Sequence, residues 1–122
     1  MILSFTVPGP PAPNERHRKG MHGNMYTPKG TVEYRKTAAW AALEATRRMP
    51  MFPLDGDVRT EMMIYFPGSK GDGDNVEKTL HDAWERILYR NDRQVRGNKW
   101  VREFNQAEPR VDVKLYTGED AL

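Results

Sequence analysis

A short stretch of the chain gathers side chains that can hold a metal ion. Asp72 and Asp74 flank a single glycine, so a tight turn would let both carboxylates converge on one point. Two like charges this close raise the cost of ionising both, and a divalent cation removes that cost because hard cations prefer oxygen ligands. Asp92 follows further along the chain and joins the pair only if the intervening elements return it there. The pattern predicts a metal site, and a phosphodiester is the substrate that such a site in a basic protein indicates.

A lysine accompanies these acidic residues. Asp74, Lys78 and Asp82 are spaced by four residues, which places them on one face of a helix. A lysine one turn from a metal-binding aspartate is placed to contact the scissile phosphate or to stabilise the charge that develops on it. The alternative is an ordinary ion pair on a solvated helix face, and the spacing alone leaves both interpretations open.

The charge distribution favours a polyanionic partner. The 122 residues carry a formal net charge of +2, which is too small to indicate nucleic acid by itself. Between Asn14 and Arg48, however, there are eight Lys or Arg and three Glu. A positive segment beside an acidic site attracts a polyanion while the carboxylates hold the cation that screens it.

Composition also limits the class of protein. The chain has no cysteine, which excludes disulfides, cysteine-ligated zinc and thiol catalysis. No apolar run approaches the ~18 residues of a membrane span, and the N-terminus lacks the pattern of a signal peptide. We therefore expect a single domain over residues 1–122, located in the cytoplasm.

Periodicity predicts an α+β fold. Alternating hydrophobic residues predict strands, and apolar residues at steps of three and four predict helices. In chain order the expected elements are a strand over 2–7, a helix over 31–49, a strand over 58–66, a helix over 74–88, a segment over 94–104 and a strand over 111–116. This order, β-α-β-α-β-β, favours a small mixed β-sheet with two helices packed on one face and a hairpin at the end.

Two local features position the chemistry. The segment from Asn14 to Lys29 is polar, basic and rich in turn residues, and we interpret it as a long surface loop that is either functional or a disordered connection. At the start of the second helix, Asp74 or Asn75 can supply the oxygen acceptor of an N-cap, while Gly73 relieves the backbone sterics of the turn.

The large aromatic and histidine side chains divide into core and surface. Trp84 lies on the apolar stripe of the second helix and is expected in the core, whereas Trp40 and Trp100 are open between packing and stacking on unpaired bases. The three histidines lack carboxylate or cysteine partners at zinc spacing and are interpreted as surface or DNA-facing residues. They are His17, His22 and His81.

Two motifs in the acidic region resemble those of a known family. They read Asp72-x-Asp74-Asn75-x-x-Lys78-x-x-x-Asp82-Ala83 and Tyr89-x-x-Asp92-x-Gln94-Val95. In this combination they are similar to the RusA family of phage-type Holliday junction resolvases. An opening strand that ends in Val7-Pro8-Gly9-Pro10, a basic loop and a closing strand after Pro109-Arg110 fall in the family's order, so the resemblance covers nearly the whole chain.

The resemblance implies a role for each motif residue. It assigns Asp72, Asp74 and Asp92 as catalytic aspartates that bind magnesium, with manganese as a possible substitute, and Lys78 as the essential lysine. Asn75 and Asp82 are implied as supporting residues. Asn91 stands where the family often has a second aspartate.

The implied activity is resolution of four-way DNA junctions by paired symmetric nicks during DNA recombination and repair. A junction has two-fold symmetry, which an isologous homodimer matches by presenting two active sites to two equivalent strands. The basic loop and first helix are expected to contact phosphates without reading sequence. The residues concerned are Arg16, Arg18, Lys19, Lys29, Arg35 and Lys36.

Two other functions are compatible with parts of the pattern. A nuclease for flaps, forks or other branches would share every residue named above and differ only in its DNA-binding surface. A non-catalytic protein that binds branched DNA is disfavoured because a binding surface gains nothing from clustered carboxylates near phosphates. Dependence of activity on a divalent cation and on the aspartates separates these functions.

Overall fold

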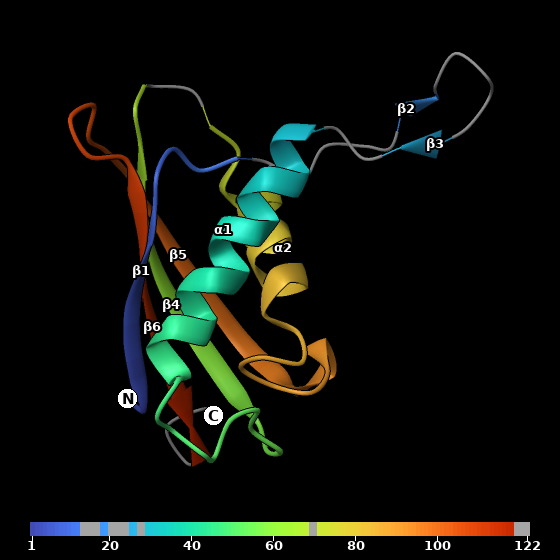
Figure 1. Cartoon of the computed structure of the whole chain (residues 1–122). Helices are drawn as coiled ribbons and strands as arrows, with labels where there is room; N and C mark the ends of the chain where they lie inside the picture. The colour runs from blue at the N-terminus through green and yellow to red at the C-terminus, as the bar shows by residue number, and fades with distance from the viewer. Residues whose placement is uncertain (13–17, 20–24, 27–28, 69–70, 119–122) are drawn as a thin grey trace.

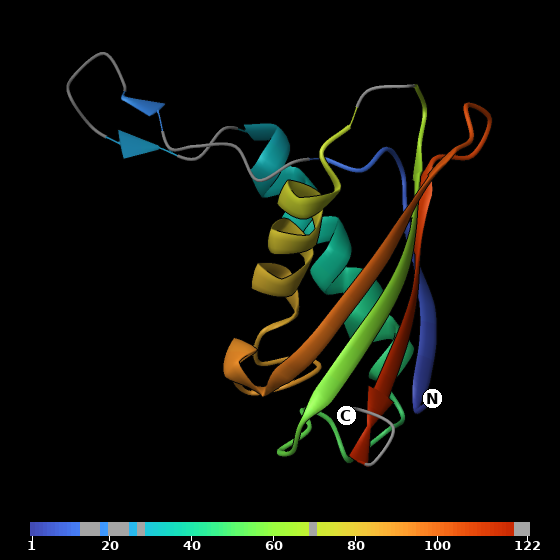
Figure 2. The ribbon, with the colours of Figure 1, turned by 180° about the vertical axis from the view of Figure 1, so that it is seen from behind.

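The protein is built on a four-stranded sheet. The computed structural model describes residues 1–12, 18–19, 25–26, 29–68 and 71–118. Figures 1 and 2 show the sheet as one layer and two helices as a second layer on one of its faces. The strands are β1 (Leu3–Pro8), β4 (Val58–Phe66), β5 (Val95–Phe104) and β6 (Arg110–Thr117), and the helices are α1 (Lys29–Thr46) and α2 (Gly73–Trp84). The predicted α+β class, with a mixed sheet and both helices on one face, is confirmed.

The strand order separates β5 from β6. Across the sheet the order is β1-β6-β4-β5, and β6 is antiparallel to both of its neighbours. The expected terminal hairpin is wrong, because β4 lies between the last two strands and pairs with β5 in parallel. A parallel pair needs a crossover connection, which α2 and the short 3-10 helix η1 (Asp92–Gln94) supply.

Burial along the strands explains this order. Alternate residues of β4 are buried along its whole length, as expected for a strand with neighbours on both sides and helices over one face. Most residues of β5 are exposed or half-buried, which is the pattern of an edge strand. The inward side chains of β4 form the floor of the core. They are Val58, Thr60, Met62, Ile64 and Phe66.

The helices bury the faces that the periodicity predicts. In α1 the buried residues include Tyr34 and three alanines, and the small side chains of the alanines let the helix pack closely on α2 and β1. The alanines are Ala38, Ala41 and Ala42. Trp84 of α2 is completely buried, as predicted.

Two features differ from the prediction. The helix α2 ends at Trp84 because Glu85 adopts an extended conformation and Arg86 has a φ of 72°. Leu88 is still buried, and its carbonyl accepts a hydrogen bond of 2.9 Å from Leu54 N. Within the predicted loop, two short strands pair as a hairpin, β2 (Arg18–Lys19) with β3 (Met25–Tyr26).

No helix in the described residues is long and apolar enough to cross a membrane.

Candidate functional site

The first aspartate of the motif caps α2. Asp72, rather than Asp74 or Asn75, is the N-cap, and its Oδ1 accepts a hydrogen bond of 3.2 Å from Asn75 N. The Asn75 side chain donates a second hydrogen bond of 2.7 Å to Oδ2 of Asp72. Both carboxylate oxygens of Asp72 therefore have a fixed donor, and each oxygen keeps a further acceptor site. Asn75 fixes the orientation of this carboxylate in the structure, while its part in catalysis stays a prediction.

The second aspartate is held by the edge strand. Nε1 of Trp100, on β5, donates a hydrogen bond of 3.1 Å to Oδ1 of Asp74. The indole also covers Gly73, where an added Cβ would lie 2.5 Å from the ring. Gly73 belongs to the helix and has no positive φ. Glycine is needed here for the close approach of Trp100, and the predicted relief of backbone strain is wrong.

The segment just before α2 is packed in the same way. An added Cβ at Gly71 would lie 2.3 Å from the ring of Phe66. Nη1 of Arg102 donates a hydrogen bond of 3.0 Å to the Gly71 carbonyl. The Arg102 guanidinium also stacks over the Phe66 ring at 5.2 Å. Residues of β4 and β5 thus fix the turn that carries both aspartates.

Lys78 and Asp92 line a shared groove of about 230 Å³. The groove lies between α2 and the beginning of β5. Its other lining residues are Glu77, His81, Asp82, Val95 and Asn98. The groove combines a cation with carboxylates of the same motif, as a site for a phosphodiester requires.

The three predicted metal ligands do not form one group. Among the residues that the structure describes, no three of His, Cys, Asp or Glu lie close enough to hold a metal ion. The topology explains this, because β5 runs parallel to β4 and so passes α2 in the opposite direction. Its middle reaches Asp74 through Trp100, while its beginning brings Asp92 beside Lys78 and His81. At a rise of about 1.5 Å per residue, Lys78 stands roughly 6 Å along the helix from Asp74.

The donor chemistry nevertheless suits a hard cation. Magnesium is commonly bound through one or two carboxylates, with water and substrate phosphates as the remaining ligands. Asp72 and Asp74 offer such a pair on one helical turn, each with an oxygen fixed by a neighbour. The assignment of Asp92 to the same ion stays a prediction.

The turn that carries Asp92 is held by its neighbours in the motif. Asn91 caps η1 by accepting a hydrogen bond of 2.9 Å from Arg93 N. Oε1 of Gln94 accepts from the backbone N of Arg90 and Asn91, at 2.8 and 2.9 Å. Nε2 of Gln94 donates a hydrogen bond of 2.8 Å to the Leu54 carbonyl. Gln94 is therefore a structural residue that sequence reasoning included in the motif but gave no function.

The ion-pair alternative for Lys78 is not realised. Asp82 pairs instead with Arg35 of α1, at 3.5 Å between Oδ2 and Nη2. In the described part of the chain, Lys78 forms no ion pair with Asp74 or Asp82. Asp82 thus connects the two helices, and Lys78 is exposed beside the groove.

Glu77 is a carboxylate of the groove that the motif analysis missed. Partial burial raises its pKa, and the charge of Asp74 raises it further. The signal was present in the sequence, since Glu77 immediately precedes Lys78. It was missed because no spacing rule connects it to the aspartates.

His81 is half-buried and lines the groove. Its Nδ1 lies 2.5 Å from the Tyr89 hydroxyl, and its Nε2 lies 3.5 Å from Oγ1 of Thr60. The ring also meets Trp84 edge to face at 5.5 Å. The chain turns after α2 and returns Tyr89 onto this histidine, so it is only partly on the surface. Its interpretation as a DNA-facing residue stays a prediction. His17 and His22 lie outside the described residues.

The environment of His81 predicts a pH-dependent stability. Burial lowers its pKa from 6.5 to about 4, against smaller opposing effects of Asn98 and Asp92. Between these values the unfolded chain binds a proton that the folded protein does not, so the free energy of unfolding decreases as the pH falls through this window. Over the whole window, the free energy of unfolding should decrease by about 3 kcal/mol. Urea unfolding at pH 7 and pH 4.5 should show the decrease in the wild type and a smaller one in His81→Gln. An equal decrease in both proteins would assign it to other groups.

The predicted DNA contacts are only partly described. Lys29 and Lys36 are exposed on α1, whereas the Arg35 side chain is half-buried and pairs with Asp82. Arg18 and Lys19 belong to β2, and their side chains are not described. Arg16 lies outside the described residues. Contact of these six residues with DNA stays a prediction.

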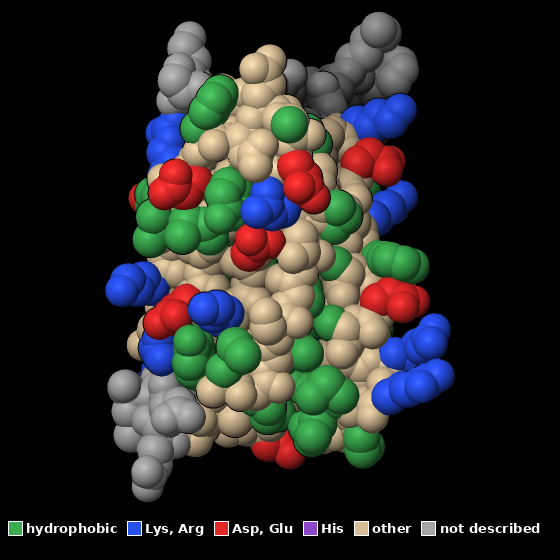
Figure 3. Space-filling view, turned by 90° about the vertical axis from the view of Figure 1, so that its left-hand side faces the viewer, with side chains coloured by type: hydrophobic (Ala, Val, Ile, Leu, Met, Phe, Trp, Pro, Cys, Tyr) green, Lys and Arg blue, Asp and Glu red, His purple; other side chains and the backbone are tan. Residues whose placement is uncertain are grey.

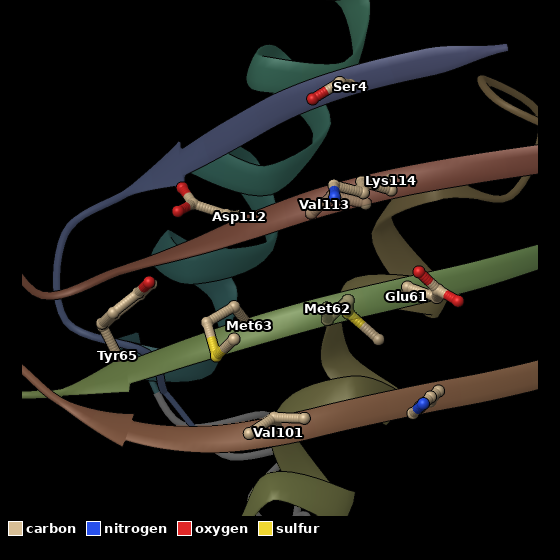
Figure 4. A pocket seen from close by; sticks show the side chains of 10 residues that line it. Ser4, Glu61, Met62, Met63, Tyr65, Val101, Asp112, Val113 and Lys114 are labelled. Carbon is tan, nitrogen blue, oxygen red and sulfur yellow. The ribbon is translucent and has the colours of Figure 1, made fainter. Parts of the chain in front are cut away.

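A larger hollow, of about 390 Å³, lies on the outer face of the sheet. Figure 4 shows side chains of β4, β5 and β6 around it, including Glu61, Val101 and Lys114. Acidic and basic side chains alternate with hydrophobic ones on this face (Figure 3). Because both signs of charge are interspersed, the outer face lacks the field that attracts a polyanion. The helical side, where the aspartates lie, is therefore the better candidate for the site.

Fixed aspartates at a helix N-terminus, with a lysine one turn further on, are side-chain types that metal-dependent cleavage of phosphodiesters can use. The sequence profile of endodeoxyribonuclease RusA matches residues 8–116. The chain therefore belongs to the RusA endodeoxyribonuclease family, as the motif resemblance predicted. It is also similar to the uncharacterized protein YqaN of Bacillus subtilis (strain 168), with 25% identity over 135 residues that cover 93% of this chain and 94% of YqaN.

Family membership fixes the activity at a coarse level. It implies an endodeoxyribonuclease that acts on branched DNA and depends on a divalent metal. The particular junction, the identity of the metal and the number of subunits need separate arguments.

Proposed function

We propose that this protein is a magnesium-dependent endonuclease that resolves four-way DNA junctions by paired, symmetric nicks in recombination and repair. The observation that carries the proposal is the acidic turn at the N-terminus of α2, with Lys78 one turn away, in a chain that matches the RusA profile over residues 8–116. The proposed location is the cytoplasm of a bacterial or phage-infected cell.

Each motif residue has a defined task in this proposal. Asp72 and Asp74 would hold magnesium, and Asp92, in the groove beside Lys78, would be the third carboxylate of the site. The bound cation would activate water and neutralise charge on the attacked phosphate. Lys78 would stabilise the charge that develops on the phosphate oxygens during cleavage. Asn75 supports this arrangement by holding Asp72, and Asp82 supports it by joining α2 to α1.

A homodimer is part of the proposal because cleavage must occur twice. Resolution of a junction requires nicks in two equivalent strands. A two-fold dimer presents one groove to each of them, and the symmetry of the dimer then matches the symmetry of the DNA. Phosphate contacts from Lys29 and Lys36 on α1 would add affinity without selecting a sequence.

Cleavage of defined DNA substrates tests the proposal. The purified protein is incubated with a synthetic four-way junction, a flap and a linear duplex, each labelled on every strand, with magnesium, with manganese or with EDTA. We expect symmetric nicks in the junction, no cleavage of the duplex and no cleavage in EDTA. Equal cutting of flap and junction would replace the proposal by a general branch nuclease. Binding of the junction without cutting in either metal would replace it by a non-catalytic DNA-binding function.

A further inference from the structure

The hydrogen bond between Trp100 and Asp74 joins an aromatic side chain outside the motif to a carboxylate inside it. Nε1 of Trp100 donates this hydrogen bond to Oδ1 of Asp74 over 3.1 Å. Among the described residues Oδ2 of Asp74 receives no hydrogen bond. Carboxylates that bind metals are commonly oriented by a donor on one oxygen, and loss of such a donor weakens metal binding or activity.

The sheet holds the backbone of the donor, and its ring packs on the helix that carries the acceptor. Trp100 lies in the middle of β5, directly opposite Met62 of β4, which is buried. Its ring covers Gly73 so closely that an added Cβ would lie 2.5 Å away. The indole therefore has a fixed position relative to the first turn of α2.

We propose that Trp100 is a positioning residue of the active site, whose indole N–H orients the Asp74 carboxylate for metal binding. The inference rests on the proposed function and deepens it, since it identifies a residue of the edge strand that completes the site. It also explains why Gly73 separates the two aspartates, because no larger residue leaves room for the indole.

A purely structural role makes a different prediction. If Trp100 only packs on α2, replacing it by phenylalanine would change stability and leave the cleavage rate of the folded protein unaltered. If its N–H orients Asp74, the same change would lower the rate even where the protein is fully folded. The two roles are therefore separable by one substitution.

The first test is Trp100→Phe, with cleavage of a four-way junction measured under single-turnover conditions. We expect a rate about 10- to 100-fold below the wild type at limiting magnesium, with unchanged affinity for the junction. Thermal unfolding identifies the temperature at which the variant is folded. The matched control is Tyr116→Phe on the outer face of the sheet. It removes the hydroxyl that donates a hydrogen bond of 3.0 Å to Oε2 of Glu61. A rate for Trp100→Phe equal to that of Tyr116→Phe and the wild type would overturn the proposal.

The second test observes the site without cleavage. The indole N–H signals of Trp40, Trp84 and Trp100 are followed by NMR while Mn²⁺ is added to the free protein. The Trp100 signal should broaden at the lowest Mn²⁺ concentration, because its N–H donates a hydrogen bond to the carboxylate that would bind the metal. The substitution Asp74→Asn should abolish this selective broadening. Equal broadening of all three signals, or none, would overturn the proposal.

The two tests separate failure of the inference from failure of the proposed function. A wild-type protein that cuts the junction, together with an unaffected Trp100→Phe, refutes only the role of Trp100. A wild-type protein that cuts no branched DNA in magnesium or manganese refutes the proposed function itself, and the positioning proposal falls with it.

Discussion

Replacing Asp74 by asparagine is expected to lower the rate of junction cleavage by about 10³-fold, while affinity for the junction stays equal or increases. The substitution removes a carboxylate that would hold the cation and also removes a negative charge near the DNA phosphates. It keeps an oxygen that can accept the hydrogen bond from Trp100, so the turn should remain folded. Single-turnover cleavage and a binding titration in calcium measure the two effects separately.

The matched control is Asp112→Asn on the outer face of the sheet. Asp112 accepts hydrogen bonds from Thr6 at 2.9 Å and Arg110 at 3.2 Å, so it too is a carboxylate held by neighbours. Because it lies on the sheet face opposite the helices, this variant should cleave at the wild-type rate. Normal cleavage by Asp74→Asn would show that Asp74 is not a catalytic residue.

The acidic motif could be placed from sequence because its residues are close in the chain. Asp72, Asp74 and Lys78 fall on the first turns of one helix, and helical spacing decides their neighbourhood. The location of Asp92 could not be found in this way. It depends on which strand β5 pairs with, and the periodicity of a strand identifies its faces but not its neighbours.

The same limit explains the residues whose roles the sequence left open or misassigned. Trp100 reaches Asp74 only because β5 is the edge strand next to β4 and passes the N-terminus of α2. His81 is half-buried only because the chain reverses at Arg86 and places Tyr89 against it. Gly73 looked like a turn residue, whereas its small size is required by a ring more than twenty positions away in the chain. These contacts are set by tertiary structure and leave no local pattern.

Among the predictions for stability, the largest effect is expected from Trp84→Ala. Trp84 is completely buried, and its Nε1 donates a hydrogen bond of 3.2 Å to the Ala38 carbonyl of α1. Its ring meets Phe5 of β1 edge to face at 5.5 Å, so one side chain connects both helices and the sheet. Loss of such a ring costs about 3–5 kcal/mol. This is a large part of the roughly 5–15 kcal/mol that stabilise a domain.

The exposed Trp40 provides the comparison. Its side chain is 65% exposed on α1, so Trp40→Ala should change the free energy of unfolding by no more than about 0.5 kcal/mol. Urea unfolding of both variants at pH 7 gives the two values. If Trp84→Ala were as stable as Trp40→Ala, the packing of α1, α2 and β1 around one indole would be wrong, and with it the framework that places the aspartates. A large loss in Trp84→Ala alone would show that the contacts of this indole stabilise the fold that carries α2.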